Sequence, residues 1–416
     1  MRIGVILNYE RDWPPGIRAE KQTVALANAG HQVFVLSPRF KESAKSPEFV
    51  ESVKATVVRV SIPSVSKRYL RNMITAITMY DNRFYNPILN FIKEYELDIL
   101  HVHDIWLIPV SLRAASFFGI PVVADLHENM PAAKRVERSE YGFFRKMIDA
   151  TFWNYHLMRW HESRMLKKCA HTFIVTPEAG ERLLEYGITE NNFSVVSNTE
   201  DETTFNDDEK AADPEIVCKY ENYFMCSYIG TTGAHRGLNT VLKAIPKASK
   251  SIPNLKLVIV GADPINIDKI GAEVNRLNIQ KWVEVIGWQP FDKVHSYIMS
   301  SDICLVPHND FEHTQTTIPH KLFQYMICRK PVLVSDCKPL KRVVEYAQCG
   351  GIFKASNSDS FASVLLELYQ NRFNLLHLGE NGRLAALGKF AWKNDAKVMI
   401  DVFNKIKNDF KESKNN

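Results

Sequence analysis

A glycine-rich turn in the second half of the chain carries a cation. Residues 230–237 read Gly-Thr-Thr-Gly-Ala-His-Arg-Gly, between an apolar run that ends at Ile229 and a helical pattern that begins at Leu238. The backbone N–H groups of such a strand-to-helix turn can bind phosphate. The glycine spacing matches neither a P-loop nor a dinucleotide fingerprint, so a plain tight turn remains the alternative.

A second cation lies at the start of another helical segment. Pro319 suits the first helical position, which places His320 and Lys321 in the first turn, after an apolar run over 303–306. A cation there opposes the helix dipole at a cost of about 0.3–1 kcal/mol, and a bound anion reverses that sign. Lys321 by itself could extend to solvent. Because Arg236 stands at a similar junction, the coincidence favours one diphosphate site that uses both cations.

Polar clusters in the first half of the chain also follow apolar runs. Gly16 lies in the loop after the first run, where a glycine either lets the backbone approach a ligand or shapes a turn. The other two clusters are His101-Val102-His103-Asp104 and Asp125-Leu126-His127-Glu128-Asn129. A histidine among carboxylates and an amide suits hydrogen bonding to a sugar, although a lone histidine is more often structural.

The elements that position these residues form a repeated pattern of short β-branched runs and helical stretches, which is typical of βαβ units. The runs of the first half are residues 2–7, 32–36, 98–102, 121–124, 171–175 and 193–196. The runs of the second half are residues 223–229, 255–260, 283–286, 303–306 and 331–334. Ligands of open parallel sheets bind beyond the carboxyl ends of the strands, which is where the polar clusters fall.

The length of 416 residues exceeds the size at which one core usually stops growing, so two domains are expected. Residues 199–215 are acidic and polar, a composition that marks a linker between the two series of strands. We therefore predict a doubly wound parallel α/β domain over 1–200, a second one over 201–394, and a terminal helix over 395–416.

Composition excludes several classes of protein. The seven cysteines are scattered and never form a CxxC pair, so neither a disulfide framework nor a zinc site is indicated, and we expect no metal and no cofactor. A net charge of +5 is too small to indicate nucleic acid without a motif, although it suits phosphates or an anionic lipid surface. We find no signal peptide and no run of about 18 apolar residues. The expected location is the cytoplasm, including the inner face of the membrane.

Over essentially the whole chain, the ordered set of motifs resembles the retaining GT-B glycosyltransferases of family four. The matching segments are HVHD, PVVADLH, VVSNTED, GTTGAHRG, IGWQPFDKV, SSDICLVP and KLFQYMICRKPVLVSD. The resemblance implies two Rossmann-like domains that face a central cleft, with the last helix crossing back to the first domain. It also implies metal-independent transfer, with retention of configuration, from a nucleotide-diphosphate sugar to a glycan. Lipid-linked and surface-polysaccharide glycans are the expected acceptors.

The resemblance assigns roles to individual residues. Gly16 would offer its N–H to the donor phosphate, His127 would contact the donor sugar near the reacting bond, and Arg236 takes the place of the family's diphosphate-binding lysine. Further donor contacts are expected from Asn198, Gly230, Thr231, Trp288, Gln289, Thr316, Thr317, Ile318 and Gln324. On the acceptor side we expect His103, Asp104, Glu128 and Asn129.

Three positions depart from the family pattern. Thr231 stands where many members have a phosphate-binding arginine. Thr316 and Gln324 occupy the two glutamate positions of the EX7E motif, and Gln324 can still hydrogen-bond a ribose hydroxyl without carrying charge. Lys321 supplies positive charge that Thr231 lacks, so His127, Arg236 and Lys321 are the predicted catalytic set of a variant branch.

Two other functions remain open. A nucleotide-sugar epimerase has the same architecture but needs no acceptor, so it would convert the donor alone. A catalytically silent nucleotide-sugar-binding protein would explain the loss of both motif glutamates, and it would bind nucleotide without turnover. A NAD-dependent dehydrogenase is less favoured, since no GxGxxG follows a strand.

Residues 132–170 combine cations with aromatic and aliphatic side chains. Nine lysines and arginines stand there against four acidic residues. Either these helical segments pack on the sheet with a solvated outer face, or they form a surface that binds anionic lipid head groups.

Overall fold

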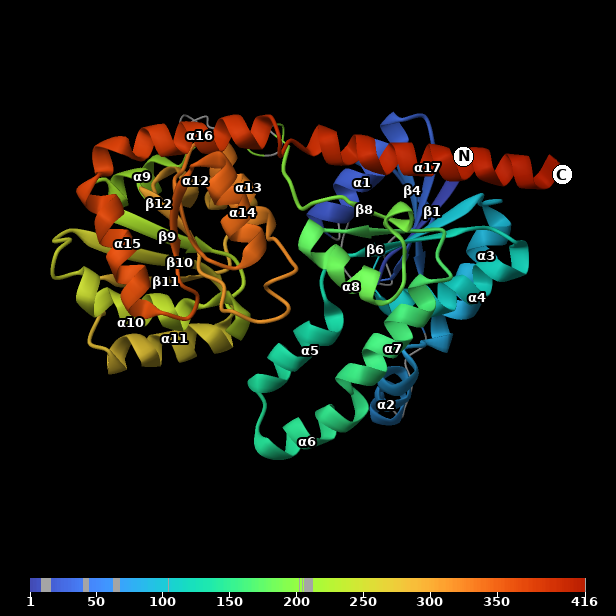
Figure 1. Cartoon of the computed structure of the whole chain (residues 1–416), viewed down its shortest axis with the longest axis horizontal. Helices are drawn as coiled ribbons and strands as arrows, with labels where there is room; N and C mark the ends of the chain where they lie inside the picture. Colours follow the sequence, from blue (N-terminus) through green and yellow to red (C-terminus); the bar gives the residue numbers. More distant parts are fainter. Residues whose placement is uncertain are drawn as a thin grey trace. The chain divides into compact units, whose positions relative to one another are not determined.

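The computed structural model describes residues 1–8, 16–39, 45–62, 68–103, 105–201, 203, 205 and 212–415. Asp104, one of the predicted acceptor-side residues, lies outside this set. The chain divides into two compact units (Figure 1). Unit 1 comprises residues 1–197 and 395–416, and unit 2 comprises residues 198–394.

Unit 1 is built on an eight-stranded sheet with the order β3-β4-β2-β1-β5-β6-β7-β8. All neighbouring strands are parallel except β3, which pairs with β4 in the antiparallel sense. The strands are β1 Arg2–Ile6, β2 Gln32–Pro38, β3 Glu48–Val50, β4 Ala55–Val60, β5 Ile99–His103, β6 Val122–Leu126, β7 His171–Ile174 and β8 Phe193–Val195. Strands β3 and β4, which extend one side of the sheet beyond β2, were not predicted.

Helices cover both faces of this sheet, so β5 and β6 are buried at every position, including His101, His103 and Asp125. The helices are α1 Ile17–Asn28, α2 Arg68–Thr78, α3 Tyr85–Glu94, α4 Ile108–Phe118, α5 Met130–Ser139, α6 Phe143–Phe152, α7 Tyr155–Leu166 and α8 Gly180–Glu185. The last helix, α17 Trp392–Asn415, belongs to unit 1 from Asp395 onward. In Figure 1, α5 and α6 extend away from the sheet.

Unit 2 is a six-stranded, entirely parallel sheet with the order β11-β10-β9-β12-β13-β14. Its strands are β9 Phe224–Ile229, β10 Leu255–Ala262, β11 Val283–Gly287, β12 Ile303–Val306, β13 Val332–Ser335 and β14 Gly350–Phe353. Its helices are α9 Pro214–Tyr220, α10 Leu238–Ala248, α11 Pro264–Arg276, α12 Phe291–Met299, α13 His320–Ile327, α14 Lys338–Ala347, α15 Ser358–Gln370 and α16 Leu375–Leu387. Both units are therefore doubly wound α/β sheets, as the alternating pattern predicts. Strand β14 was not predicted.

The turn after β9 packs tightly against the loop after β12, because these two strands are neighbours. Gly237 has a φ of +72°, and a Cβ at this position would lie 1.7 Å from the carbonyl oxygen of Pro307. No side chain fits there, so glycine at position 237 allows the two strand ends to meet.

We expect Gly237→Ala to destabilise the protein by at least about 2 kcal/mol, since it combines an unfavourable φ with a backbone clash. Gly271 in α11 is the matched control, because a Cβ there meets nothing within 4 Å. Gly271→Ala should stabilise the helix by about 0.5–1 kcal/mol. Urea unfolding of both variants measures the difference, and equal effects would contradict the packing described here.

Candidate functional site

Two cationic side chains lie at the carboxyl edge of the unit 2 sheet. Arg236 ends the short 3₁₀ turn Ala234–Arg236 after β9, and its Nη1 lies 3.1 Å from Nε2 of His308, which follows β12. Lys321 lies in the first turn of α13. The two strands are adjacent in the sheet, so the structure brings together the turns that the sequence analysis singled out.

Lys321 points back over the glycine-rich turn. Its Nζ lies 3.7 Å from the centre of the Tyr228 ring, and a Cβ added to Gly230 would come within 2.9 Å of that nitrogen. Gly230 has a φ of +125° and leaves the space that the ammonium group occupies. Burial, and then the charge of Arg236, hold the pKa of Lys321 well below its usual value.

Three histidines surround the cations. His308 is fully buried, and burial followed by the charge of Arg236 holds its pKa well below the usual value. The same two causes lower the pKa of His235 to about 3. The His235 ring lies 5.4 Å from that of His313. Sequence reasoning did not select these histidines, although their adjacency to Arg236 and to the end of β12 was a usable signal.

This cluster contains several polar atoms without a partner. Four buried atoms have no hydrogen-bond partner among the described residues: Thr232 Oγ1, Arg236 Nε, His308 Nδ1 and Lys321 Nζ. Buried polar groups are normally satisfied, and a buried cation without an anion is costly. Because the arginine and lysine nitrogens are donors, the arrangement suits an anionic ligand.

The loop that leads into α13 is held by its own hydrogen bonds. Asn198 Nδ2 donates to the carbonyl of Ile318 at 2.8 Å, and Thr316 Oγ1 donates to the carbonyls of Glu312 and His313 at 3.2 Å. The side chain of Ile318 is buried, so it does not face a ligand. Thr317 between them is half-buried. The side chains of Asn198 and Thr316 thus shape the loop.

Gln324 lies beside a buried carboxylate. Glu200 Oε1 lies 3.3 Å from Gln324 Nε2 and 3.0 Å from His320 Nδ1, and the Glu200 side chain is inaccessible to solvent. A carboxylate therefore stands next to the second position of the EX7E motif, although that position itself holds glutamine. Sequence reasoning missed Glu200, because it fell in the acidic stretch assigned to the linker.

The remaining donor-side residues are more exposed. Thr231 is exposed, and its carbonyl accepts a hydrogen bond from the Tyr228 hydroxyl. Trp288 follows β11 and is 77% exposed, and its carbonyl accepts a hydrogen bond from Gln289 Nε2 at 3.1 Å. Strand β11 is separated from β12 by two strands, so Trp288 and Gln289 share the edge of the sheet with the cations but are displaced along it.

In unit 1, His127 belongs to a buried chain of polar groups at the carboxyl ends of β5 and β6. Its Nε2 lies 2.9 Å from Nδ1 of His103, and that nitrogen lies 3.7 Å from Asp125 Oδ2. Arg18 completes the chain, with Nη2 at 2.7 Å and Nε at 3.1 Å from Asp125 Oδ1. His101 Nε2 also lies 3.7 Å from Asp125 Oδ2.

Arg18 and Asp125 compensate each other's charge. Burial by itself raises the pKa of Asp125, but the charge of Arg18 and the neighbouring His101 outweigh burial and hold that pKa well below its usual value. Burial, and then His101, lower the pKa of His103. Ligand atoms of His101, His103 and Asp125 lie within 4.8 Å of one another. The Arg18 guanidinium group already pairs with the Asp125 carboxylate. We therefore interpret His101, His103 and Asp125 as a hydrogen-bond network and not as a metal site.

Gly16 lies immediately before α1, whose first turn contains Arg18. Its φ of 178° is extended backbone, and a Cβ at this position meets nothing within 4 Å. Within the described part of the chain, the local structure therefore does not itself require glycine there.

Of the described acceptor-side residues, Glu128 reaches a cavity. The cavity has a volume of about 370 Å³ and is also lined by Trp106, Trp153 and Lys134. The two tryptophan rings meet edge to face, with centres 5.0 Å apart. The cavity lies at the same edge of the sheet as His127, since Trp106 follows β5 and Glu128 follows β6.

His103 and Asn129 have internal partners. Asn129 Oδ1 accepts from the backbone N–H of Ala132, at the start of α5, and from Arg182 Nη1 at 3.0 Å. Its side chain is buried, as is that of His103. The prediction that these two residues contact the acceptor directly is not supported by their placement, because neither reaches the surface.

Comparison with known proteins matches both units. The model described as Glycosyltransferase Family 4 matches residues 19–202, and the model described as Glycosyl transferases group 1 matches residues 209–385. The chain is 21% identical over 378 residues to phosphatidyl-myo-inositol mannosyltransferase of Mycolicibacterium smegmatis, which covers 89% of this chain and 85% of that protein.

Solved structures show the same fold. Sucrose-phosphate synthase from Thermosynechococcus elongatus superposes with a TM-score of 0.77 at 14% identity, over 97% of this chain and 98% of that one. Anabaena HepE in complex with UDP-glucose superposes with a TM-score of 0.72 at 12% identity, over 97% of this chain and 100% of that one. With two parallel α/β units and family models that match each of them, the chain belongs to glycosyltransferase family four and has the GT-B fold.

Proposed function

We propose that the protein transfers a sugar from a nucleotide-diphosphate sugar to a glycan, with the diphosphate bound at the cation cluster of unit 2. The observation that carries this proposal is the set of unpartnered donors around Arg236 and Lys321. A nucleoside diphosphate leaving group gains negative charge as the glycosidic bond breaks. Donors already fixed at that position stabilise the charge without reorganisation.

The protein's own cations also support a metal-independent reaction. Arg236 and Lys321 supply positive charge to the diphosphate, which is the role that a divalent cation plays elsewhere. Retention of configuration follows from the family resemblance and awaits product analysis. The carboxylate of Glu200 beside Gln324 supports an active variant rather than a silent binding protein.

His127 is the candidate contact with the donor sugar. It is half-buried, and its Nε2 is held at 2.9 Å by His103, which is in turn fixed beside Asp125. A ring oriented by such a chain of partners loses little entropy when substrate binds. We propose that this network positions His127 at the reacting bond.

The acceptor sugar is proposed to occupy the cavity lined by Trp106, Trp153 and Glu128. Aromatic rings offer apolar surface to a sugar ring, and a carboxylate accepts hydrogen bonds from its hydroxyl groups. The mycobacterial relative is named for a lipid acceptor, phosphatidyl-myo-inositol, and HepE was solved with UDP-glucose. We accordingly propose a lipid-linked or surface-polysaccharide glycan as acceptor, with UDP-sugars as the first donors to test.

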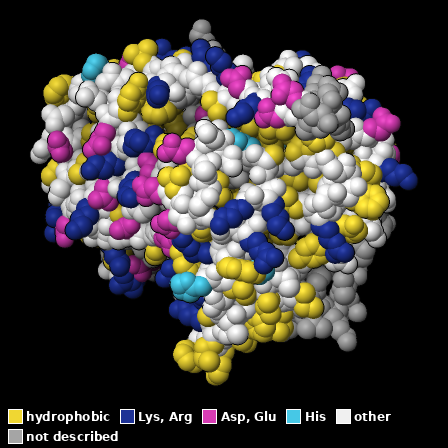
Figure 2. Space-filling model, turned by 45° about the vertical axis from the view of Figure 1, so that its right-hand side comes forward, with side chains coloured by type: hydrophobic (Ala, Val, Ile, Leu, Met, Phe, Trp, Pro, Cys, Tyr) yellow, Lys and Arg dark blue, Asp and Glu magenta, His cyan; other side chains and the backbone are white. Residues whose placement is uncertain are grey.

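Helix α6 supports an acceptor that resides in a membrane. None of its residues is buried, and Phe143 and Phe144 are 71% and 79% exposed. Figure 2 shows hydrophobic side chains gathered at the lower tip of the molecule, the level of α6 in Figure 1. Arg145 and Lys146 follow the two phenylalanines in the same helix. Apolar side chains flanked by cations are typical of interfacial helices, and no described helix is long and apolar enough to span a bilayer.

The cation cluster is tested by Arg236→Ala and Lys321→Ala. Each substitution should weaken binding of the preferred nucleoside diphosphate, chosen among UDP, GDP and ADP, about 10- to 100-fold. The double variant should lose less than the product of the two effects, since both side chains contact one ligand. Titration calorimetry measures the affinities, with the exposed Lys341→Ala in α14 as control. Wild-type affinity in both single variants would place the diphosphate elsewhere.

Nucleoside diphosphate binding should take up protons. The pKa of Lys321 is well below its usual value in the empty site, and an adjacent dianion raises it. Affinity is therefore highest at a pH below the pKa of free Lys321. It declines, by up to about tenfold per pH unit, as pH rises toward the pKa in the complex. Calorimetry in buffers of different ionisation enthalpy measures the uptake, which Lys321→Ala should reduce. Identical heats in all buffers would contradict a protonation change.

His127→Ala should lower kcat at least about 100-fold, with nucleoside diphosphate affinity changed less than about threefold, because its partner is the sugar at the reacting bond. The exposed His377→Ala in α16 is the control and should leave both values unchanged. Steady-state transfer assays and calorimetry separate the two quantities. An equal loss of kcat and affinity would show that His127 is structural.

The protein should bind vesicles of anionic phosphatidylglycerol reversibly and less strongly at high salt. Arg145→Glu with Lys146→Glu should weaken binding at least about tenfold, since each cation near an anionic surface contributes about 1 kcal/mol. Lys243→Glu with Lys250→Glu in unit 2 changes the net charge equally and should have little effect. If sedimentation at low salt shows no vesicle binding, a soluble acceptor is favoured.

A further inference from the structure

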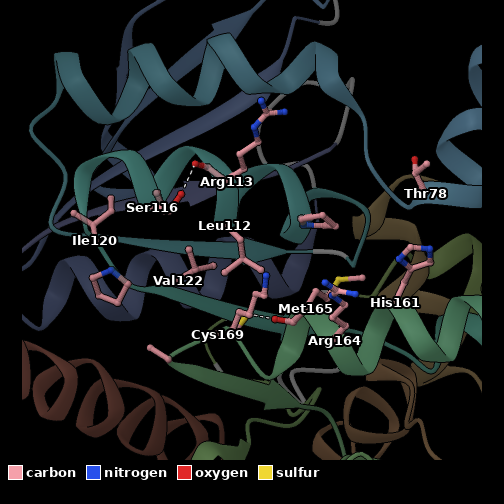
Figure 3. A pocket seen from close by; sticks show the side chains of 15 residues that line it. Thr78, Leu112, Arg113, Ser116, Ile120, Val122, His161, Arg164, Met165 and Cys169 are labelled. Atoms are coloured by element: carbon pink, nitrogen blue, oxygen red, sulfur yellow. Dashed lines mark hydrogen bonds between the residues drawn. The ribbon is translucent and has the colours of Figure 1, made fainter.

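Unit 1 contains a larger cavity that the proposed reaction does not use. It has a volume of about 660 Å³ and lies between α4 and α7 (Figure 3). Val122, the first residue of β6, and Ala170, the residue before β7, both line it. The cavity is therefore at the amino ends of these strands, whereas His127 is at the carboxyl end of β6.

The interior of this cavity is aliphatic. Figure 3 shows Leu112 above Val122 near the centre, with Ile120 toward one end and Met165 toward the other. None of the residues that line it is phenylalanine, tyrosine or tryptophan. A nucleotide base or a sugar ring would therefore find no aromatic surface to stack on, whereas a hydrocarbon chain fits such a wall.

The rim of the cavity is cationic. Arg164 and Lys168 line it together with His161, at a spacing that puts all three on one side of α7 and its end. Arg113 lines the cavity from α4, but its guanidinium group turns away toward Tyr80 and Tyr85, with Nη1 donating to the Tyr80 hydroxyl at 3.1 Å. No acidic side chain lines the cavity, and none of these arginines and lysines forms an ion pair within the described part of the chain.

The position of Arg164 and Lys168 at the end of α7 is favourable for the helix dipole. Positive charge at one side of the opening, with no acidic side chain among the residues that line the cavity, favours a ligand with an anionic group at the rim and an apolar body inside.

We propose that this cavity binds the acyl chain of an anionic membrane lipid, with its phosphate at Arg164 and Lys168. The surroundings favour the membrane as the source. Ile74 and Ile77 of α2 are 51% and 41% exposed, and Trp160 of α7 is 52% exposed. Helix α2 packs against both α6 and α7, and its last residue, Thr78, lines the cavity. The opening thus adjoins an apolar surface, and the site is separate from the proposed sugar transfer.

The test uses dodecyl phosphate below its critical micelle concentration as the probe, titrated calorimetrically into the full chain. Inorganic phosphate lacks the hydrocarbon chain, and dodecyl maltoside lacks the anion. Dodecyl phosphate should bind at least tenfold more tightly than either. It should bind equally to wild type and to the Arg236→Ala/Lys321→Ala variant, which removes the cations of unit 2. If inorganic phosphate binds as tightly as dodecyl phosphate, the cavity is a simple anion site. If dodecyl maltoside binds as tightly as dodecyl phosphate, the cavity is an unspecific apolar site. Either result overturns the proposal.

Two sets of substitutions test the cationic rim and the apolar interior of the cavity separately. Arg164→Glu with Lys168→Glu should weaken dodecyl phosphate binding at least tenfold by reversing the rim. Ser116→Trp should do so by filling the space, and its exposed position in α4 tolerates a large side chain. Arg145→Glu with Lys146→Glu in α6 changes the net charge equally and should leave this affinity unchanged.

Thermal unfolding and nucleoside diphosphate binding at wild-type values establish that the cavity variants and the α6 variant are folded, and thermal unfolding alone does so for the Arg236→Ala/Lys321→Ala variant. The proposal is overturned if the cavity variants bind the probe like wild type, or if the α6 variant loses as much affinity as they do. Sugar transfer is measured separately. If the protein transfers sugar but does not bind dodecyl phosphate, this inference alone is wrong. If it binds dodecyl phosphate but does not transfer sugar, the proposed function alone is wrong.

Discussion

A buried nitrogen of a basic side chain is costly when it has no hydrogen-bond partner, and the described residues at the carboxyl edge of the unit 2 sheet contain two such atoms, Arg236 Nε and Lys321 Nζ. The local structure is arranged around them. Gly230 leaves room for the lysine ammonium group, Gly237 lets the turn after β9 reach Pro307, and the adjacency of β9 and β12 brings the two helix starts to one place. Under the proposed function, a bound diphosphate would accept hydrogen bonds from these nitrogens and offset this cost.

In unit 1, by contrast, a buried charge is compensated by another side chain of the protein. The carboxylate of Asp125 is fully buried but is paired with Arg18 at 2.7 Å, so no ligand is needed to compensate it. The result is a rigid support for His103 and, through it, for His127. One unit therefore has cationic nitrogens without a hydrogen-bond partner, and the other has a buried carboxylate that is paired with an arginine beside a histidine ring.

Two positions where the sequence departs from the expected family pattern have charged neighbours. Gln324 stands where the resemblance places a glutamate, and the Glu200 carboxylate lies 3.3 Å from its amide nitrogen. Thr231 stands where the resemblance places an arginine, and the basic side chain of Lys321 lies at the same edge of the sheet. Charges of the expected sign are present, but different positions of the chain supply them.

The sequence by itself determined the two series of strands, the fold and the family, because periodicity and motif order are local properties. It also predicted that Arg236 and Lys321 share one site, since each stands at a recognisable strand-to-helix junction. Only the tertiary structure decided which residues far apart in the sequence contact each other. Arg18 meets Asp125 across 107 positions and Glu200 meets Gln324 across 124, and no local pattern marks either pair. Nor could sequence show that Asn129 caps a helix instead of facing an acceptor, because burial of a polar side chain depends on what packs over it.

The strands β3, β4 and β14 were missed for a related reason. They lie at or near the edges of their sheets, where a strand is short or only partly buried and its apolar signal is correspondingly weak.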